Sequence, residues 1–152
     1  MTEDRLTSEL ELLSFRLAEQ EYSVDIMSVR EIRGWTRATP LPHSPHYMRG
    51  VINLRGTVLP VIDLASRLGM PPVEGDARNV IIVVQSEGQS VGLLVDAVSD
   101  ILALPRDQLQ PPPEISADAA AGFIQALTIV EGRMIRVLDL SSVLPGYRTD
   151  AA

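Results

Sequence analysis

Two ordered pairs of similar segments run through the chain, and this duplication restricts the fold more than any other feature. In the first pair, residues 60–68 resemble residues 136–144, and each copy runs from an apolar strand into a short helix. In the second pair, residues 23–32 resemble residues 92–101, and each copy passes through Val-x-(acid)-Ile. Two copies are too few for a solenoid or a propeller. We therefore expect two similar small β-barrels that pack together and leave a groove at their seam.

Residues 50–64 have the pattern of a β-hairpin. Two apolar runs flank a four-residue polar turn at positions 53–56, and Gly56 can supply the positive φ that such turns demand. Arg55 would project from this rigid tip beside residues that carry no charge. A cation in that place is either a solvated surface side chain or the anchor of a protein contact.

Composition excludes several kinds of chemistry. The 152 residues include no cysteine and no lysine, and the net charge is −7. Disulfides, thiolate nucleophiles, Walker-A lysines and Schiff bases are therefore excluded. A negative chain without a basic stripe does not favour nucleic-acid binding. No apolar run approaches the roughly 18 residues that a membrane span needs, and the acidic N-terminus is unlike a signal peptide. We expect a cytoplasmic protein without membrane insertion.

The expected organisation is one domain with short ends. Residues 1–10 form a flexible N-terminus, residues 11–145 form the domain, and residues 146–152 form a polar tail. Within the domain we predict two pseudo-repeated subdomains, about 11–70 and 78–145, that partly exchange strands. The patterning predicts about ten strands and little helix. Ser44-Pro45 predicts one or two helical turns that stop at Gly50, and Asp63 predicts the cap of a short helix.

Two motifs suggest chemistry and are better explained by structure. Residues 88–92 match G-x-S-x-G, which would make Ser90 a nucleophile. That elbow needs a strand–turn–helix context and a histidine later in the chain, whereas His43 and His46 both precede the serine. A small serine hydrolase or ligand-binding β-barrel built on this motif is the alternative function. The two histidines lie in a proline-rich segment that offers a metal site little ordered support.

Four aspartates recur at the ends of predicted strands and could be taken for paired catalytic acids. Their repeated positions favour capping or turning of the backbone instead. The four are Asp25, Asp63, Asp96 and Asp139.

Four apolar residues of the Val-x-(acid)-Ile repeats are candidates for the seam. Val29 and Ile32 occupy places equivalent to Val98 and Ile101. If the repeats pack about a pseudo-twofold axis, all four face one groove with Arg55 at its edge, which is what a helix-in-groove interface needs. The alternative is that they are ordinary core residues.

With these residues in view, the chain resembles the CheW family of chemotaxis coupling proteins. The likeness runs from about residue 12 to residue 144 and rests on motifs in the family's order. These are residues 21–26 with 29–34, 50–56, 60–64 and 95–102. The resemblance implies an all-β fold of two interlocked five-stranded SH3-like β-barrels with short connecting helices. It also implies an adaptor without enzymatic activity or cofactor.

The resemblance further implies two partners. Family members link the cytoplasmic tip of methyl-accepting chemoreceptors to the regulatory domain of the histidine kinase CheA. We expect a monomer that is recruited to membrane-associated receptor arrays. The receptor-binding residues implied by matching position are Val29, Glu31, Ile32, Gly50, Asn53, Arg55, Val98 and Ile101. The implied kinase-binding residues are Trp35, Ala38, Pro40, Leu41 and Ile115, although the proline run at 111–113 departs from commoner members.

Overall fold

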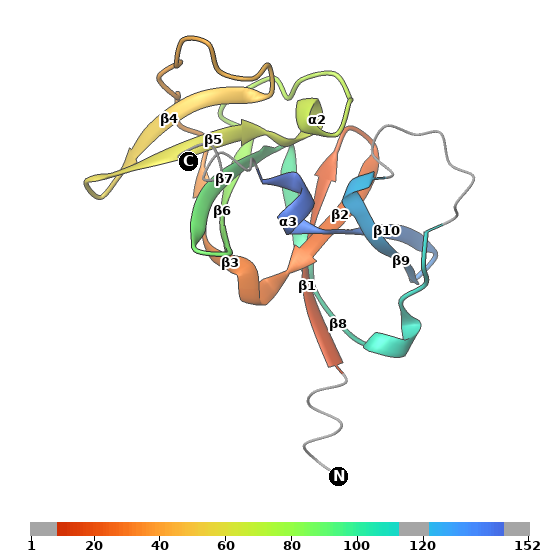
Figure 1. Cartoon of the computed structure of the whole chain (residues 1–152). Helices are drawn as coiled ribbons and strands as arrows, with labels where there is room; N and C mark the ends of the chain where they lie inside the picture. The colour runs from red at the N-terminus through yellow and green to blue at the C-terminus, as the bar shows by residue number, and fades with distance from the viewer. Residues whose placement is uncertain (1–8, 113–121, 145–152) are drawn as a thin grey trace.

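The computed structural model describes residues 9–112 and 122–144, and these residues are mostly β-strand (Figure 1). Two short α-helices and two 3-10 turns connect the strands. The strands are β1 (Glu9–Leu17), β2 (Gln20–Asp25), β3 (Val29–Gly34), β4 (Met48–Leu54), β5 (Thr57–Asp63), β6 (Val80–Ser86), β7 (Gln89–Val95), β8 (Ala97–Pro105), β9 (Ile124–Val130) and β10 (Arg133–Leu138). The helical elements are η1 (Ile26–Ser28), α2 (Leu64–Arg67), η2 (Arg106–Gln108) and α3 (Leu140–Val143).

The strands form two five-stranded sheets of identical topology. Sheet A has the order β8-β1-β2-β10-β9, and sheet B has the order β3-β6-β7-β5-β4. Adding five to each strand number of sheet A, and continuing from β10 to β1, gives the strand order of sheet B. The parallel pairs are also equivalent, since β10 pairs with β2 and β5 pairs with β7. Each sheet combines strands from both halves of the chain, so the two units interlock as expected.

In each sheet, one isolated bridge joins the segment that follows one edge strand (β3 or β8) to the opposite edge strand (β4 or β9). In sheet B, Thr39 and Val51 exchange backbone hydrogen bonds of 2.8 and 2.9 Å. In sheet A, Gln110 and Leu127 do the same at 2.8 Å in both directions. The strand ladders leave the sheets open, and each bridge brings the segment after one edge strand against the other edge strand, as in an SH3-like barrel.

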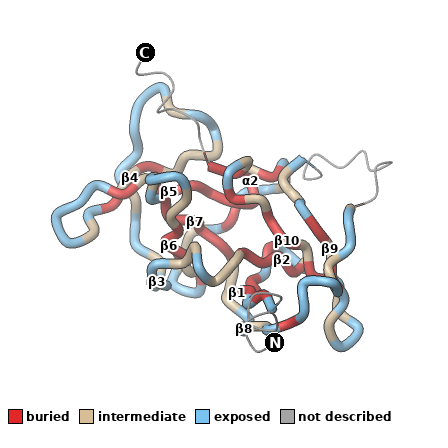
Figure 2. Tube along the Cα trace, turned by 60° about the horizontal axis from the view of Figure 1, so that its bottom comes forward, coloured by how far each residue is buried: buried red, intermediate tan, exposed pale blue. Residues whose placement is uncertain are grey.

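The larger apolar core contains residues from both sheets. Phe15 and Val24 of sheet A belong to the same buried cluster as Ile82 and Leu93 of sheet B. A smaller cluster around Leu12 and related residues belongs to sheet A alone. Figure 2 shows the buried residues concentrated along the middle strands of each sheet. Each fully buried aliphatic side chain stabilises the fold by about 1.5–3 kcal/mol, so the shared core ties the two sheets together.

The four repeated aspartates have the structural roles predicted for them. Asp63 caps α2 by accepting a hydrogen bond from Ser66 N, and Asp139 caps α3 by accepting one from Ser141 N. Asp25 accepts from Met27 N at the start of η1. Asp96 accepts from Ala18 N at 2.6 Å and so holds the β1–β2 turn. These caps satisfy backbone donors that a helix or turn leaves unpaired.

Two local predictions were wrong in detail. No helix forms after Ser44-Pro45, because β4 begins at Met48 and leaves room for only a single turn, closed by Met48 N donating to Pro45 O at 3.0 Å. The β4–β5 turn has two residues rather than four, since Leu54 already pairs with Thr57. Its two residues are Arg55 and Gly56, with φ of 51° and 87°, which is the backbone of a type I′ hairpin.

Candidate functional site

A β-bulge at the start of β3 decides which of its side chains share a face. Val29 lies opposite Val84 and Ile32 lies opposite Ile82, while Arg30 is left out of the register. Val84 and Ile82 are two residues apart on β6, so their partners point to the same side of the sheet. Val29 packs against the larger core and Ile32 is 48% exposed.

The equivalent bulge occurs on β8. Val98 lies opposite Phe15 and Ile101 lies opposite Leu13, with Ser99 left out of the register. Val98 packs against the same core as Val29, and Ile101 is 59% exposed. The Val-x-(acid)-Ile pattern therefore places one half-buried valine and one exposed isoleucine at the edge of each sheet.

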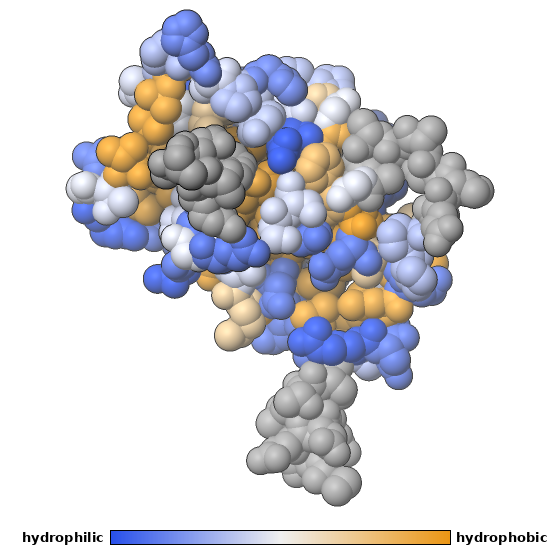
Figure 3. Space-filling model, viewed as in Figure 1, coloured by the Kyte–Doolittle hydropathy of each residue, from blue (hydrophilic) through white to orange (hydrophobic). Residues whose placement is uncertain are grey.

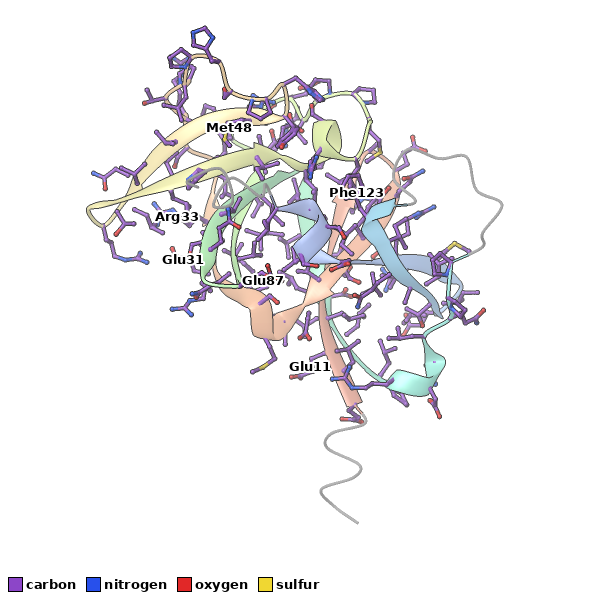
Figure 4. The ribbon with its side chains drawn as sticks, in the orientation of Figure 1. Glu11, Glu31, Arg33, Met48, Glu87 and Phe123 are labelled. Atoms are coloured by element: carbon purple, nitrogen blue, oxygen red, sulfur yellow. The ribbon has the colours of Figure 1, made fainter. Side chains whose placement is uncertain are left out.

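Glu31 of β3 and Arg55 of the β4–β5 turn form an ion pair. Arg55 Nη2 lies 2.6 Å from Glu31 Oε1, and Arg33 Nη1 lies 3.2 Å from Glu31 Oε2. Arg55 has no charged neighbour within its own hairpin segment, and its partner comes from a strand 24 residues away. Figure 4 shows Glu31 and Arg33 on the side of β3 that faces the hairpin.

The ion pair keeps Glu31 ionised and leaves Arg55 accessible. The pKa of Glu31 is lowered, first because Arg55 donates a hydrogen bond to its carboxylate and second because Arg33 does so. The hydrogen bond to Glu31 likewise raises the pKa of Arg55. The Arg55 side chain is still 69% exposed. A held but accessible guanidinium can bind a second carboxylate or a carbonyl oxygen.

Gly50 and Asn53 shape the backbone of this region. Gly50 is buried, its φ is +139°, and a Cβ there would stand 2.1 Å from the carbonyl oxygen of Thr39. The bridge between Thr39 and Val51 therefore requires glycine at this position. Asn53 Oδ1 accepts a hydrogen bond from Gly56 N at 2.7 Å, which fixes the turn that carries Arg55.

A recess of about 280 Å³ opens beside the Glu31–Arg55 pair, and Ser90 and Leu59 are among its lining residues. Ser90 is the second residue of β7, which follows a two-residue turn, so its context is strand–turn–strand rather than the strand–turn–helix of a nucleophile elbow. No histidine lines the recess. The hydrolase alternative therefore has no support in the geometry.

The residues expected to contact a kinase gather at a second recess. Trp35, Ala38 and Pro40 are among the residues that line it. Leu41 is 45% exposed nearby in the sequence, and Ile115 lies outside the described residues. The ends at 1–8 and 145–152 also lie outside them.

Sequence reasoning missed Arg49 in this second recess. Arg49 is the extra residue of a bulge between Met48 and Gly50. Its guanidinium lies 3.0 Å from Asp63 Oδ2, and Asp63 is 2% exposed. The sequence shows only an arginine directly before Gly50. That position does not reveal that Arg49 pairs with Asp63.

Metal chemistry finds no support in the part of the chain that the structure covers. Within residues 9–112 and 122–144, no group of three or more His, Cys, Asp or Glu residues is placed to hold a metal ion. The helices of the same residues include none that is long and apolar enough to cross a membrane.

Paired SH3-like barrels with exposed apolar edges and an accessible ion pair define a class of protein-binding scaffolds. Comparison with known proteins gives the family. The model of the CheW-like domain family matches residues 11–147, so the chain belongs to this family, whose members are scaffolds and adaptors rather than enzymes.

Relatives and a solved structure agree with this assignment. The chain is 55% identical to a probable chemotaxis protein CheW of Rhizobium etli, over 93% of this chain and 92% of that protein. It is 53% identical to the chemotaxis protein CheW of Rhizobium meliloti over the same shares. The crystal structure of the scaffolding protein TtCheW from Thermoanaerobacter tengcongensis aligns with a TM-score of 0.82 at 32% identity, covering 90% of this chain and 88% of that one.

Proposed function

We propose that the protein is a non-enzymatic adaptor that couples methyl-accepting chemoreceptors to the CheA histidine kinase in chemotaxis signalling. The observation that carries this proposal is the Glu31–Arg55 pair beside the exposed apolar edge of β3. Arg55 is 69% exposed, and Ile32 offers apolar surface on the same strand as Glu31. An amphipathic receptor helix needs both kinds of contact.

The receptor surface in this proposal is the seam between the sheets. Val29 and Val98 form its floor, Ile32 and Ile101 form its exposed sides, and Arg55 is its polar anchor. Asn53 and Gly50 act through the backbone, because one fixes the turn and the other allows the close approach of Thr39.

The kinase surface is the segment from Trp35 to Leu41 at the other recess. The two recesses lie at opposite ends of sheet B. Leu59 and Val83 line the first, whereas Val61 and Ile81 line the second farther along the same strands. Two ends of one barrel support simultaneous binding of two partners. We infer that the protein acts in the cytoplasm as a monomer that these partners recruit to receptor arrays.

The Arg55→Ala variant tests the receptor surface. We expect receptor-fragment binding to weaken by about 1–3 kcal/mol, the usual loss for a charged interface anchor, with unchanged binding of the kinase regulatory domain. Arg78→Ala is the matched control, because Arg78 is also an exposed arginine in an ion pair and lies in the segment before β6 of sheet B. Titration calorimetry measures both affinities, and equal losses for both partners would contradict the assignment.

A buried charge tests the floor of the same surface. Val29→Asp places an unpaired carboxylate against the larger core and should abolish receptor binding. If Val29→Asp unfolds, Ile32→Asp serves as the second test, because Ile32 is already half exposed and a charge there should leave the fold intact. Full receptor binding by a folded Ile32→Asp protein would remove the β3 edge from the interface.

The two-surface arrangement has its own test. Transient complexes of this kind bury about 1,200 Å² or less and are weak, so both partners can be titrated at micromolar concentrations. We expect the regulatory domain to bind a protein already saturated with receptor fragment. Competition between the two fragments for one site would overturn the arrangement.

A further inference from the structure

The recess at the Trp35 end of sheet B has a built interior. Its volume is about 300 Å³. Val61, Ile81 and Leu94, all at most 1% exposed, line its floor. Its lining residues include Arg37 and Arg49 and no acidic residue. A recess lined by arginines and by no acid is notable in a chain whose net charge is −7. Arg49 is already paired with Asp63, so the charge of Arg37 is what favours an anion there.

Two N–H donors in this recess have no partner among the described residues. Arg49 uses Nε and Nη2 on Asp63 and Nη2 on the carbonyl of Val73, which leaves Nη1 unused. Trp35 Nε1 makes no hydrogen bond there either. Neither atom is completely buried, because Arg33 Nε is the one fully buried side-chain N or O atom without a partner in the described ranges.

Gly75 brings the two donors to one place. A Cβ at residue 75 would stand 2.9 Å from Arg49 Nη1 and 3.5 Å from Trp35 Nε1. The loop is held in position because Asn79 Oδ1 accepts from Gly75 N at 2.7 Å and from Asp76 N at 2.8 Å. The absence of a side chain at Gly75 therefore leaves both donors uncovered on the same side of the loop.

We propose that this recess receives a carboxylate side chain, a glutamate or an aspartate, from the protein partner that docks on the segment from Trp35 to Leu41. One carboxylate oxygen accepts from Arg49 Nη1 and the other from Trp35 Nε1, while the apolar stem lies on Val61 and Leu94. Charged hydrogen bonds of this kind are about twice as strong as neutral ones. The identity of the partner rests on the kinase contact proposed above, and the carboxylate chemistry rests on the recess itself.

Gly75→Ala is the variant that isolates this site. Its methyl group would stand 2.9 Å from Arg49 Nη1 and so displaces that end of the guanidinium while keeping its charge, whereas removing Arg49 would leave the buried Asp63 without a cation. Gly88→Ala is the matched control. Gly75 and Gly88 have φ of +79° and +77°, but a Cβ at Gly88 meets nothing within 4 Å. Both variants carry the same backbone strain, and only one fills the recess.

The first measurement uses the single tryptophan of the chain. Trp35 gives one indole N–H signal in a nitrogen-15 spectrum, so it reports on the recess without ambiguity. We expect a saturable shift of this signal with acetyl-Gly-Glu-Gly-amide and none with acetyl-Gly-Gln-Gly-amide. The shift should persist in Gly88→Ala and disappear in Gly75→Ala. Equal responses to the two peptides, or no response to either, would overturn the carboxylate site.

The second measurement uses the CheA regulatory domain as the probe. Gly75→Ala should weaken its binding by about tenfold relative to Gly88→Ala, which corresponds to about 1.4 kcal/mol. Receptor-fragment binding should be the same for both variants. Equal affinity of the two variants, with a Trp35 signal that still shifts, would overturn the carboxylate inference and leave the kinase contact standing. A regulatory domain that fails to bind at all would overturn the proposed function, and the peptide titration would still decide the recess.

Discussion

The β4–β5 and β9–β10 hairpins occupy equivalent places in the two sheets, yet their arginines have different surroundings. Arg55 is 69% exposed and pairs with the accessible Glu31. Arg133 is 39% exposed, and its Nη1 lies 2.9 Å from Glu21, which is 7% exposed. Glu21 also accepts from the hydroxyl of Ser14 at 3.0 Å. One hairpin therefore leaves its cation exposed to solvent, and the other places its cation against a buried acid.

The acids of the two Val-x-(acid)-Ile repeats show the same division. Glu31 holds Arg55 at 2.6 Å, whereas the equivalent Asp100 lies 3.9 Å from Arg133. Figure 3 shows apolar surface along the β4–β5 hairpin, where Val58 is 69% exposed. A duplicated backbone thus carries one hairpin with an exposed ion pair and one with a partly buried ion pair, and the side chains decide which is which.

The largest expected effect concerns the equivalent positions Gly50 and Ala126. The two closing bridges place Gly50 one residue before Val51 and Ala126 one residue before Leu127. Gly50→Ala should cost about 3 kcal/mol or more of unfolding free energy, because it adds backbone strain and a clash with Thr39 O. Ala126→Gly should cost only about 1 kcal/mol. Urea unfolding measures both, and equal costs would show that sheet B tolerates a side chain there.

The next effect compares the two hairpin arginines by stability. Arg133→Ala leaves the buried Glu21 without its cation and should cost about 2 kcal/mol, below the full range for a buried pair because Arg133 is partly exposed. Arg55→Ala removes an exposed pair and should cost less than about 1 kcal/mol. Thermal and urea unfolding test this order. A reversed order would assign the structural role to the β4–β5 hairpin.

A smaller effect concerns the cap of α3. Hydrogen bonds from the hydroxyls of Ser141 and Ser142 lower the pKa of Asp139, with Ser141 the larger cause. Because its pKa is lowered by folding, the ionised carboxyl adds to the stability of the fold at any pH above the ordinary pKa of about 3.9. This contribution is lost as the pH falls through the pKa of the folded state. Asp139→Ala should therefore cost about 1 kcal/mol at pH 7 and reduce the loss of stability on acidification. If the variant lost stability on acidification as steeply as the unmodified protein, other carboxylates would be the main cause of that loss.

The smallest expected effect is a change in the ionisation of Glu31 on the edge strand β3. Removing the guanidinium in Arg55→Ala should raise the pKa of Glu31 toward its ordinary value, because Arg55 is the main cause of the lowering. Arg33→Ala should raise it less. Carbon-13 titration of the Glu31 carboxyl measures both shifts. A Glu31 pKa unchanged by either variant would mean that the ion pair does not persist in solution.

Local features of the fold were predictable from the sequence. Gly56 and the apolar runs around it predicted the β4–β5 hairpin, and Asp63 and Asp139 predicted the caps of α2 and α3. The repeats predicted two equivalent units. Each of these features depends on residues close together in the chain, where a positive φ or a capping side chain leaves few alternatives.

The tertiary structure decided which strands meet and which charges pair. Apolar strands can pair with many edges, so the repeats alone did not determine that β1 and β2 join β8–β10 while β3–β5 join β6 and β7. The Glu31–Arg55 pair and the meeting of Arg49 with Trp35 and Gly75 depend on that pairing. Within residues 9–112 and 122–144, the duplication was determined by the sequence itself. The difference between the β3 and β8 edges was decided by contacts between distant strands, because a side chain's partner depends on which strands lie next to it.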